Sequence, residues 1–134
     1  MTALAGAAGA WVGFQYGLTR VQSNSSLDDV LHHQLGLTAE QENRIGALEA
    51  EFAKSRKALE GEMRAANRDL SAALGSEHEY GPQAKQAIER FHLAMGALQE
   101  QTIKHILAMR AALTPEQAER FDKTVLEALT AGQP

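Results

Sequence analysis

The stretch Leu37-Thr-Ala-Glu-Gln41 marks the start of the longest helical segment of the chain, and its pattern returns at Leu113-Thr-Pro-Glu-Gln117. In each copy a Thr precedes an amphipathic stretch and a Gln follows three positions later, which is the arrangement of a capping box. Pro115 strengthens the second copy, because proline suits the first position of a helix. We therefore expect one helix to begin at Ala39 and another at Pro115.

The segment after the first motif predicts a helix of about 35 residues, because its apolar residues recur at steps of three, four and seven. These residues are Ile45, Leu48, Phe52, Leu59, Met63, Ala66, Leu70 and Leu74. The pair Gly75-Ser76 predicts the end of this helix.

A second long helix is predicted from Pro82 to about Leu113. Its inward seam is Ile88, Phe91, Met95, Leu98, Thr102, His105 and Met109. His78 and His92 lie off the apolar seams and are expected at the surface. Two long helices joined by a short polar turn predict an antiparallel hairpin.

Two shorter helices complete the expected fold. The first spans about Leu27–Leu35 and stops at Gly36, and the second begins at Pro115 and ends near Gly132. Two pairs of an acid and a histidine lie four residues apart on the first, Asp28 with His32 and Asp29 with His33. The predicted fold class is all-α: a four-helix hooked hairpin in which the two short helices fold over the long antiparallel pair.

An apolar segment precedes this domain. Residues 2–19 carry no charge, and a helix needs about 20 apolar residues to span a bilayer. Gly9, Gly13 and Gly17 repeat every four residues, the small-residue spacing of closely packed membrane helices. We expect residues 1–20 to be a membrane anchor or uncleaved signal and residues 21–134 to be the folded domain. A soluble tail rich in alanine and glycine is the alternative.

Composition narrows the range of functions. The formal net charge of −4 argues against a nucleic-acid-binding surface. The chain has no cysteine, so a bound metal ion would be held by imidazole, carboxylate, thioether or water. The motifs of serine hydrolases, phosphate-binding loops, dinucleotide-binding folds and zinc proteases are missing from the sequence. We therefore expect neither a nucleic-acid partner nor an enzyme.

His105 and Met109 lie one turn apart on the seam of the second long helix. A histidine on an apolar face is usually a structural core residue, and methionine usually fills the core. Both side chains are also metal ligands. Further ligand types occur on two other helices: His32 with Asp28, and Glu49, for which a solvated position is the ordinary interpretation.

These side chains are expected to meet. In an antiparallel hairpin the start of one long helix lies level with the end of the other, which places Glu49 near His105 and Met109. Two imidazoles, one or two carboxylates and a thioether suit cobalt, nickel or zinc better than calcium or magnesium. The sequence therefore predicts a transition-metal site.

Several segments resemble known proteins. The two Leu-Thr-x-x-Gln motifs resemble those of the periplasmic stress proteins related to Spy and CpxP. Four segments more specifically resemble the CnrX-type periplasmic sensors of cobalt and nickel resistance systems, without gaps from Leu27 to Leu113. They are Asp28–His32, Leu48–Phe52, Met63–Asn67 and His105–Leu113.

The resemblance to the CnrX-type sensors implies four metal ligands: His32, Glu49, His105 and Met109. Asp28 stands where those sensors have a further histidine. An oxygen ligand, or none, would replace a nitrogen there, which would favour zinc or weaken nickel binding.

The same resemblance implies a mode of action. The protein would be a homodimer in the periplasm, anchored to the inner membrane, that holds a membrane-bound anti-sigma factor. Metal binding would free a sigma factor to transcribe efflux genes. Two alternatives remain: a metal-independent chaperone or stress adaptor of the Spy/CpxP kind, and a membrane-tethered hairpin with a purely structural role.

Overall fold

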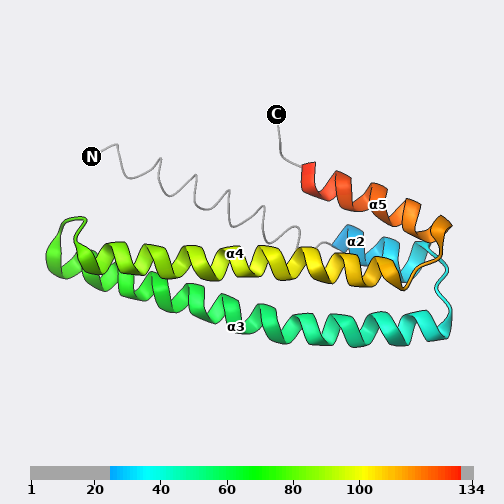
Figure 1. Ribbon diagram of the computed structural model, residues 1–134, viewed down its shortest axis with the longest axis horizontal. Coiled ribbons are helices and arrows are strands. Elements are labelled where there is room, and N and C mark those ends of the chain that lie inside the picture. The colour runs from blue at the N-terminus through cyan, green and yellow to red at the C-terminus, as the bar shows by residue number, and fades with distance from the viewer. Residues whose placement is uncertain (1–24, 131–134) are drawn as a thin grey trace. The chain divides into compact units, whose positions relative to one another are not determined.

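The computed structural model describes residues 25–130, which are helical apart from short connections (Figure 1). The elements are α2 (Ser25–Asp29), the π-helix η1 (Val30–Gln34), α3 (Ala39–Glu77), α4 (Pro82–Ala111) and α5 (Pro115–Thr130). Residues 25–130 contain no strand, so the predicted all-α class is confirmed. The predicted membrane segment, residues 1–20, lies outside the described residues. Within the described part of the chain, no helix has the length and apolar character needed to cross a membrane.

The chain divides into two compact units. The hairpin unit is Asn43–Met109. The terminal unit combines Met1–Glu42 with Arg110–Pro134, of which residues 25–42 and 110–130 are described. The expected folding of the short helices over the hairpin concerns both units together and stays a prediction.

The hairpin unit is built on an apolar seam between α3 and α4, which run antiparallel (Figure 1). Its buried cluster consists of Met63, Ala66, Phe91, Ala94 and Leu98. Phe52, Leu59 and Met95 pack against this cluster. Burial of this apolar surface is the main favourable contribution to the pairing of the two helices.

Nearer the turn, the buried side chains of the seam are alanines. Ala66, Ala73, Ala84 and Ala87 are between 0% and 3% exposed. Small side chains at the contact allow the axes of two helices to approach closely. The buried seam of the hairpin therefore changes from large apolar side chains to alanines toward the turn.

The predicted seam is wrong at its turn end. Leu74 is 45% exposed, whereas Ala73 is 2% exposed. Ala73 lies seven residues after Ala66, which keeps the seam in a heptad spacing, whereas the predicted step of four from Leu70 leads to the exposed Leu74. On α4 the buried positions Ala84, Ala87, Phe91, Ala94 and Leu98 follow the same spacing.

The end of α3 also differs from its prediction. The helix continues past Gly75, ends at Glu77, and is closed by His78, whose φ of 55° is left-handed and whose N–H donates to Leu74 O at 3.0 Å. Histidine is one of the residue types that adopts this conformation more often than most. A glycine inside a helix costs only about 1 kcal/mol relative to alanine, so Gly75 does not end the helix. The predicted exposure of His78 is confirmed.

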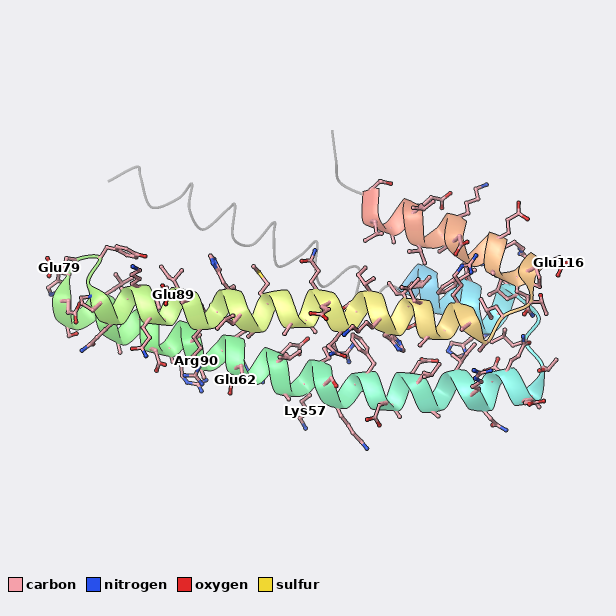
Figure 2. All side chains as sticks on the ribbon, in the orientation of Figure 1. Lys57, Glu62, Glu79, Glu89, Arg90 and Glu116 are labelled. Carbon is pink, nitrogen blue, oxygen red and sulfur yellow. The ribbon has the colours of Figure 1, made fainter. Side chains whose placement is uncertain are left out.

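One arginine links the two helices of the hairpin at its surface. Arg90 Nη2 lies 2.9 Å from Glu62 Oε2, and Nη1 lies 2.9 Å from Asp69 Oδ2. Figure 2 shows Arg90 reaching from α4 toward Glu62 of α3. The hydrogen bond to Glu62, followed by the charges of both acids, raises the pKa of Arg90. The two carboxylates are seven residues apart, so this contact repeats the heptad spacing of the buried seam.

The helix starts in the terminal unit are confirmed. Thr38 N–H donates to Gln41 Oε1 at 3.0 Å, and Gln41 N–H donates to Thr38 Oγ1 at 3.1 Å. The corresponding distances for Thr114 and Gln117 are 2.9 and 3.3 Å. Both capping boxes form as the sequence predicts, and both use a Gln rather than a Glu.

The same two glutamines also bond to each other. Gln41 Nε2 donates to Gln117 Oε1 at 2.7 Å and to Ala112 O at 3.0 Å. Gln117 Nε2 donates to Gln41 Oε1 at 3.3 Å and to Leu35 O at 3.2 Å. We call these four residues the glutamine clasp. The clasp was not predicted from the sequence, although the two Leu-Thr-x-x-Gln motifs were the available signal.

The clasp predicts that Gln117→Glu destabilises the protein. Glu can still accept from Thr114 N–H, but it cannot donate, and its second oxygen would face the acceptors Leu35 O and Gln41 Oε1. We expect a loss of about 1–3 kcal/mol, the cost of leaving part-buried polar groups unsatisfied. Urea unfolding followed by circular dichroism measures it.

The matched control is Gln99→Glu, which makes the same change at an exposed position of α4. A control of this kind is expected within about 0.5 kcal/mol of the parent. Equal midpoints for the two variants would show that the clasp does not contribute to stability.

Candidate metal-binding residues

The five candidate ligands fall in different units. Glu49, His105 and Met109 belong to the hairpin unit, and Asp28 and His32 belong to the terminal unit. Across residues 25–130, no three side chains of His, Asp or Glu gather in a potential metal-binding group. The expected meeting of all five side chains therefore stays a prediction.

His105 is half-buried on α4 and stacks on Phe52 of α3. The two ring centroids are 4.4 Å apart and the ring planes differ by 4°. On the same aromatic ring, Arg56 Cζ lies 5.9 Å from the centroid, a cation–π contact. The plane of the imidazole is therefore set by the side chain of Phe52.

The seam prediction for this part of α4 needs one correction. Thr102, Ile106 and Met109 are the buried positions, and His105 lies at the margin of the seam. Steps of four then three, through Ile106, satisfy the helical repeat as well as steps of three then four through His105. Isoleucine is more often buried than histidine, because an imidazole must keep its polar atoms satisfied.

Met109 is 4% exposed, so its thioether is in the interior. Thr102 is also buried, and its hydroxyl donates to Leu98 O at 2.7 Å, which satisfies the hydroxyl within the helix. The burial of Met109 agrees with either role, because a core side chain and a thioether that binds metal both lie in the protein interior.

Glu49 is half-buried on α3, beside the half-buried Leu48. Its predicted place at the margin of the apolar stripe is confirmed. His92 is exposed on α4, as expected.

His32 lies on η1 and contacts an acid that is not among the predicted ligands. Its Nδ1 is 3.1 Å from Glu42 Oε2. The side chains of His32 and Glu42 are 27% and 40% exposed. The two residues are ten positions apart, on either side of a turn in which Gly36 has a φ of 66°, so helical spacing gave no signal for the pair. Asp28 is exposed.

The π-helix changes the second predicted pair as well. Leu35 N–H donates to Val30 O at 3.1 Å, a step of five residues. The carboxylate of Asp29 accepts from Gln34 Nε2 at 2.7 Å, also a step of five, instead of following the predicted step of four to His33. A π-helix has a wider turn than an α-helix, which moves side chains five positions apart onto one side. Single π-turns are frequent at functional sites.

Within the terminal unit, an ion pair joins the end of α4 to α5. Arg110 Nε and Nη2 donate to the two carboxylate oxygens of Asp122 at 2.8 and 2.9 Å. This hydrogen bonding lowers the pKa of Asp122 and raises that of Arg110. Arg110 and Asp122 are close in sequence to two residues of the glutamine clasp, Ala112 and Gln117.

Residues 1–120 of the chain match the family described as heavy-metal resistance. The chain belongs to this heavy-metal resistance family. One relative is the nickel and cobalt resistance protein CnrR of Cupriavidus metallidurans, which is 30% identical over 125 residues, or 93% of this chain and 83% of the relative. The resemblance stated from the sequence is confirmed at this level: a heavy-metal resistance protein of the Spy/CpxP-like type.

Proposed function

We propose that the protein senses divalent transition metals, cobalt or nickel with zinc as the third candidate, and controls metal-efflux genes. Membership of the heavy-metal resistance family carries this proposal. The relative in Cupriavidus metallidurans is named for resistance to nickel and cobalt, which favours these two ions.

Four residues are proposed as ligands: His32, Glu49, His105 and Met109. An imidazole nitrogen, a carboxylate oxygen and a thioether together fit a borderline first-row metal ion. The half-burial of Glu49 and His105 and the burial of Met109 support this choice, because each side chain has one side toward the interior of the protein. Asp28 is proposed as an oxygen ligand that replaces a nitrogen of the CnrX-type sensors and shifts preference toward zinc.

The proposed mechanism is a metal-dependent change in helix packing. An ion held by side chains from three helices would link those helices. Such a link shifts a conformational equilibrium only by the difference in affinity between the two states. We propose that the readout is an anti-sigma factor and its sigma factor, and that residues 1–20 hold the protein at the inner membrane with the domain in the periplasm.

Removing an imidazole tests the site. The purified chain is expected to bind one cobalt, nickel or zinc ion per protomer in titration calorimetry. His105→Ala should weaken binding by more than about 100-fold, because even the outer partners of a metal-bound histidine are worth about 10- to 100-fold. His92→Ala, at an exposed position of the same helix, is the control and should bind like the parent.

Equal affinities for His105→Ala and His92→Ala would remove His105 from the site. A parent protein that binds none of the three ions would favour the metal-independent chaperone or stress adaptor instead.

A substitution at Met109 tests metal binding separately from the cellular response to the metal. Met109→Leu keeps the packing volume and removes only the sulfur. We expect the cobalt affinity to fall by about tenfold at most, because a thioether is a weak ligand, while the cobalt absorption spectrum changes and an efflux-promoter reporter loses most of its induction. An unchanged spectrum with normal induction would make Met109 a core residue only.

The protein is also proposed to be a homodimer strengthened by its N-terminal segment. The spacing of Gly9, Gly13 and Gly17 favours close contact between two membrane helices. Sedimentation equilibrium of the full chain in detergent should show a dimer that Gly13→Leu weakens. Ala8→Leu, on the other side of the same predicted helix, should not. A parent that stays monomeric would contradict the proposal.

A further inference from the structure

The contact between His32 and Glu42 lies within the terminal unit and joins η1 to the first turn of α3. The distance of 3.1 Å between His32 Nδ1 and Glu42 Oε2 is that of a hydrogen bond. An ionised carboxylate has only acceptors, so the hydrogen of this bond belongs to Nδ1 of the imidazole. A neutral imidazole that carries hydrogen on Nδ1 has its lone pair on Nε2.

Both partners of this contact are held by their surroundings. On the side of Glu42, its N–H donates to Thr38 O at 2.9 Å, and the neighbouring Gln41 is part of the glutamine clasp. On the side of His32, the flanking residues Leu31 and Leu35 are 1% and 6% exposed. The carboxylate therefore meets the imidazole through two anchored pieces of backbone.

We propose that Glu42 is a positioning residue for metal binding: it holds His32 with hydrogen on Nδ1 and so directs Nε2 to the metal ion. A metal-bound histidine commonly donates its other ring N–H to a carboxylate, which fixes the tautomer and orientation of the ring and makes the bound nitrogen more basic. This inference rests on the proposed function of His32 as a ligand. It adds Glu42, which acts on the metal through His32.

The experiment reads the tautomer before any metal is added. In the metal-free protein, ring nitrogen chemical shifts of His32, assigned by comparison with His32→Ala, should show hydrogen on Nδ1. Glu42→Ala should move the hydrogen toward Nε2. Glu42→Gln should keep it on Nδ1, because the amide oxygen still accepts.

The second measurement is cobalt affinity by titration calorimetry. Glu42→Ala should weaken binding about 10- to 100-fold, and Glu42→Gln should lose less. Glu40→Ala is the matched control, since it removes an exposed acid from the same first turn of α3. It should change neither the tautomer nor the affinity, while thermal melts check that every variant is folded.

The outcomes distinguish this inference from the proposed function. If the parent binds cobalt but Glu42→Ala leaves either the tautomer or the affinity unchanged, the positioning role is overturned and the proposed function stands. If Glu42→Ala does not fold, Glu42→Gln decides: hydrogen kept on Nδ1 with an affinity closer to the parent than to His32→Ala supports the role, and hydrogen moved to Nε2 with parent-like affinity overturns it. If the parent binds no cobalt, nickel or zinc, the proposed function fails and this inference fails with it.

Discussion

The terminal unit depends on one pair of side-chain amides. In the glutamine clasp, Gln41 and Gln117 each close the first turn of a helix, bond to each other, and bond to a backbone carbonyl of another segment. A glutamine amide suits this role because its oxygen accepts while its NH2 group donates two hydrogen bonds. The starts of α3 and α5 are therefore fixed relative to each other and to the end of η1.

In the hairpin unit, apolar burial outweighs the charges. The ion pairs of Arg90 are exposed to solvent, where pairs of this kind are worth little. The cluster around Phe91 is buried, and burial of an aromatic side chain contributes several times more. Arg90 helps to keep α4 in register with α3, because Glu62 and Asp69 repeat the heptad spacing of the buried seam.

The sequence was a good guide wherever a signal was local. Capping boxes predicted the starts of α3 and α5, and Pro82 predicted the start of α4. The failures lie where two local patterns were equally allowed. Ala73 and Leu74 both fit a helical repeat, as do His105 and Ile106, and only the packing of the folded chain decides between them.

Other features had no local signal at all. The bond between His32 and Glu42 crosses a turn, and the clasp crosses more than seventy residues. The candidate ligands were chosen from their chemistry and from a family resemblance. Their family is confirmed, and the local settings of Glu49 and Met109 agree with expectation, but ligand chemistry alone does not specify how side chains of two units are arranged.

The π-helix η1 affects how the chain tolerates the loss of a residue from this segment. Leu27, Leu31 and Leu35 are buried and lie four residues apart, whereas positions four apart on an α-helix drift by about 40° around its axis. The wide turn absorbs that drift and keeps the three leucines on one side. Losing one residue between Val30 and Gln34 would convert the π-turn to an ordinary α-turn, so the residues before it would keep their side of the helix. This short segment can therefore lose one residue with less disturbance than a regular α-helix can.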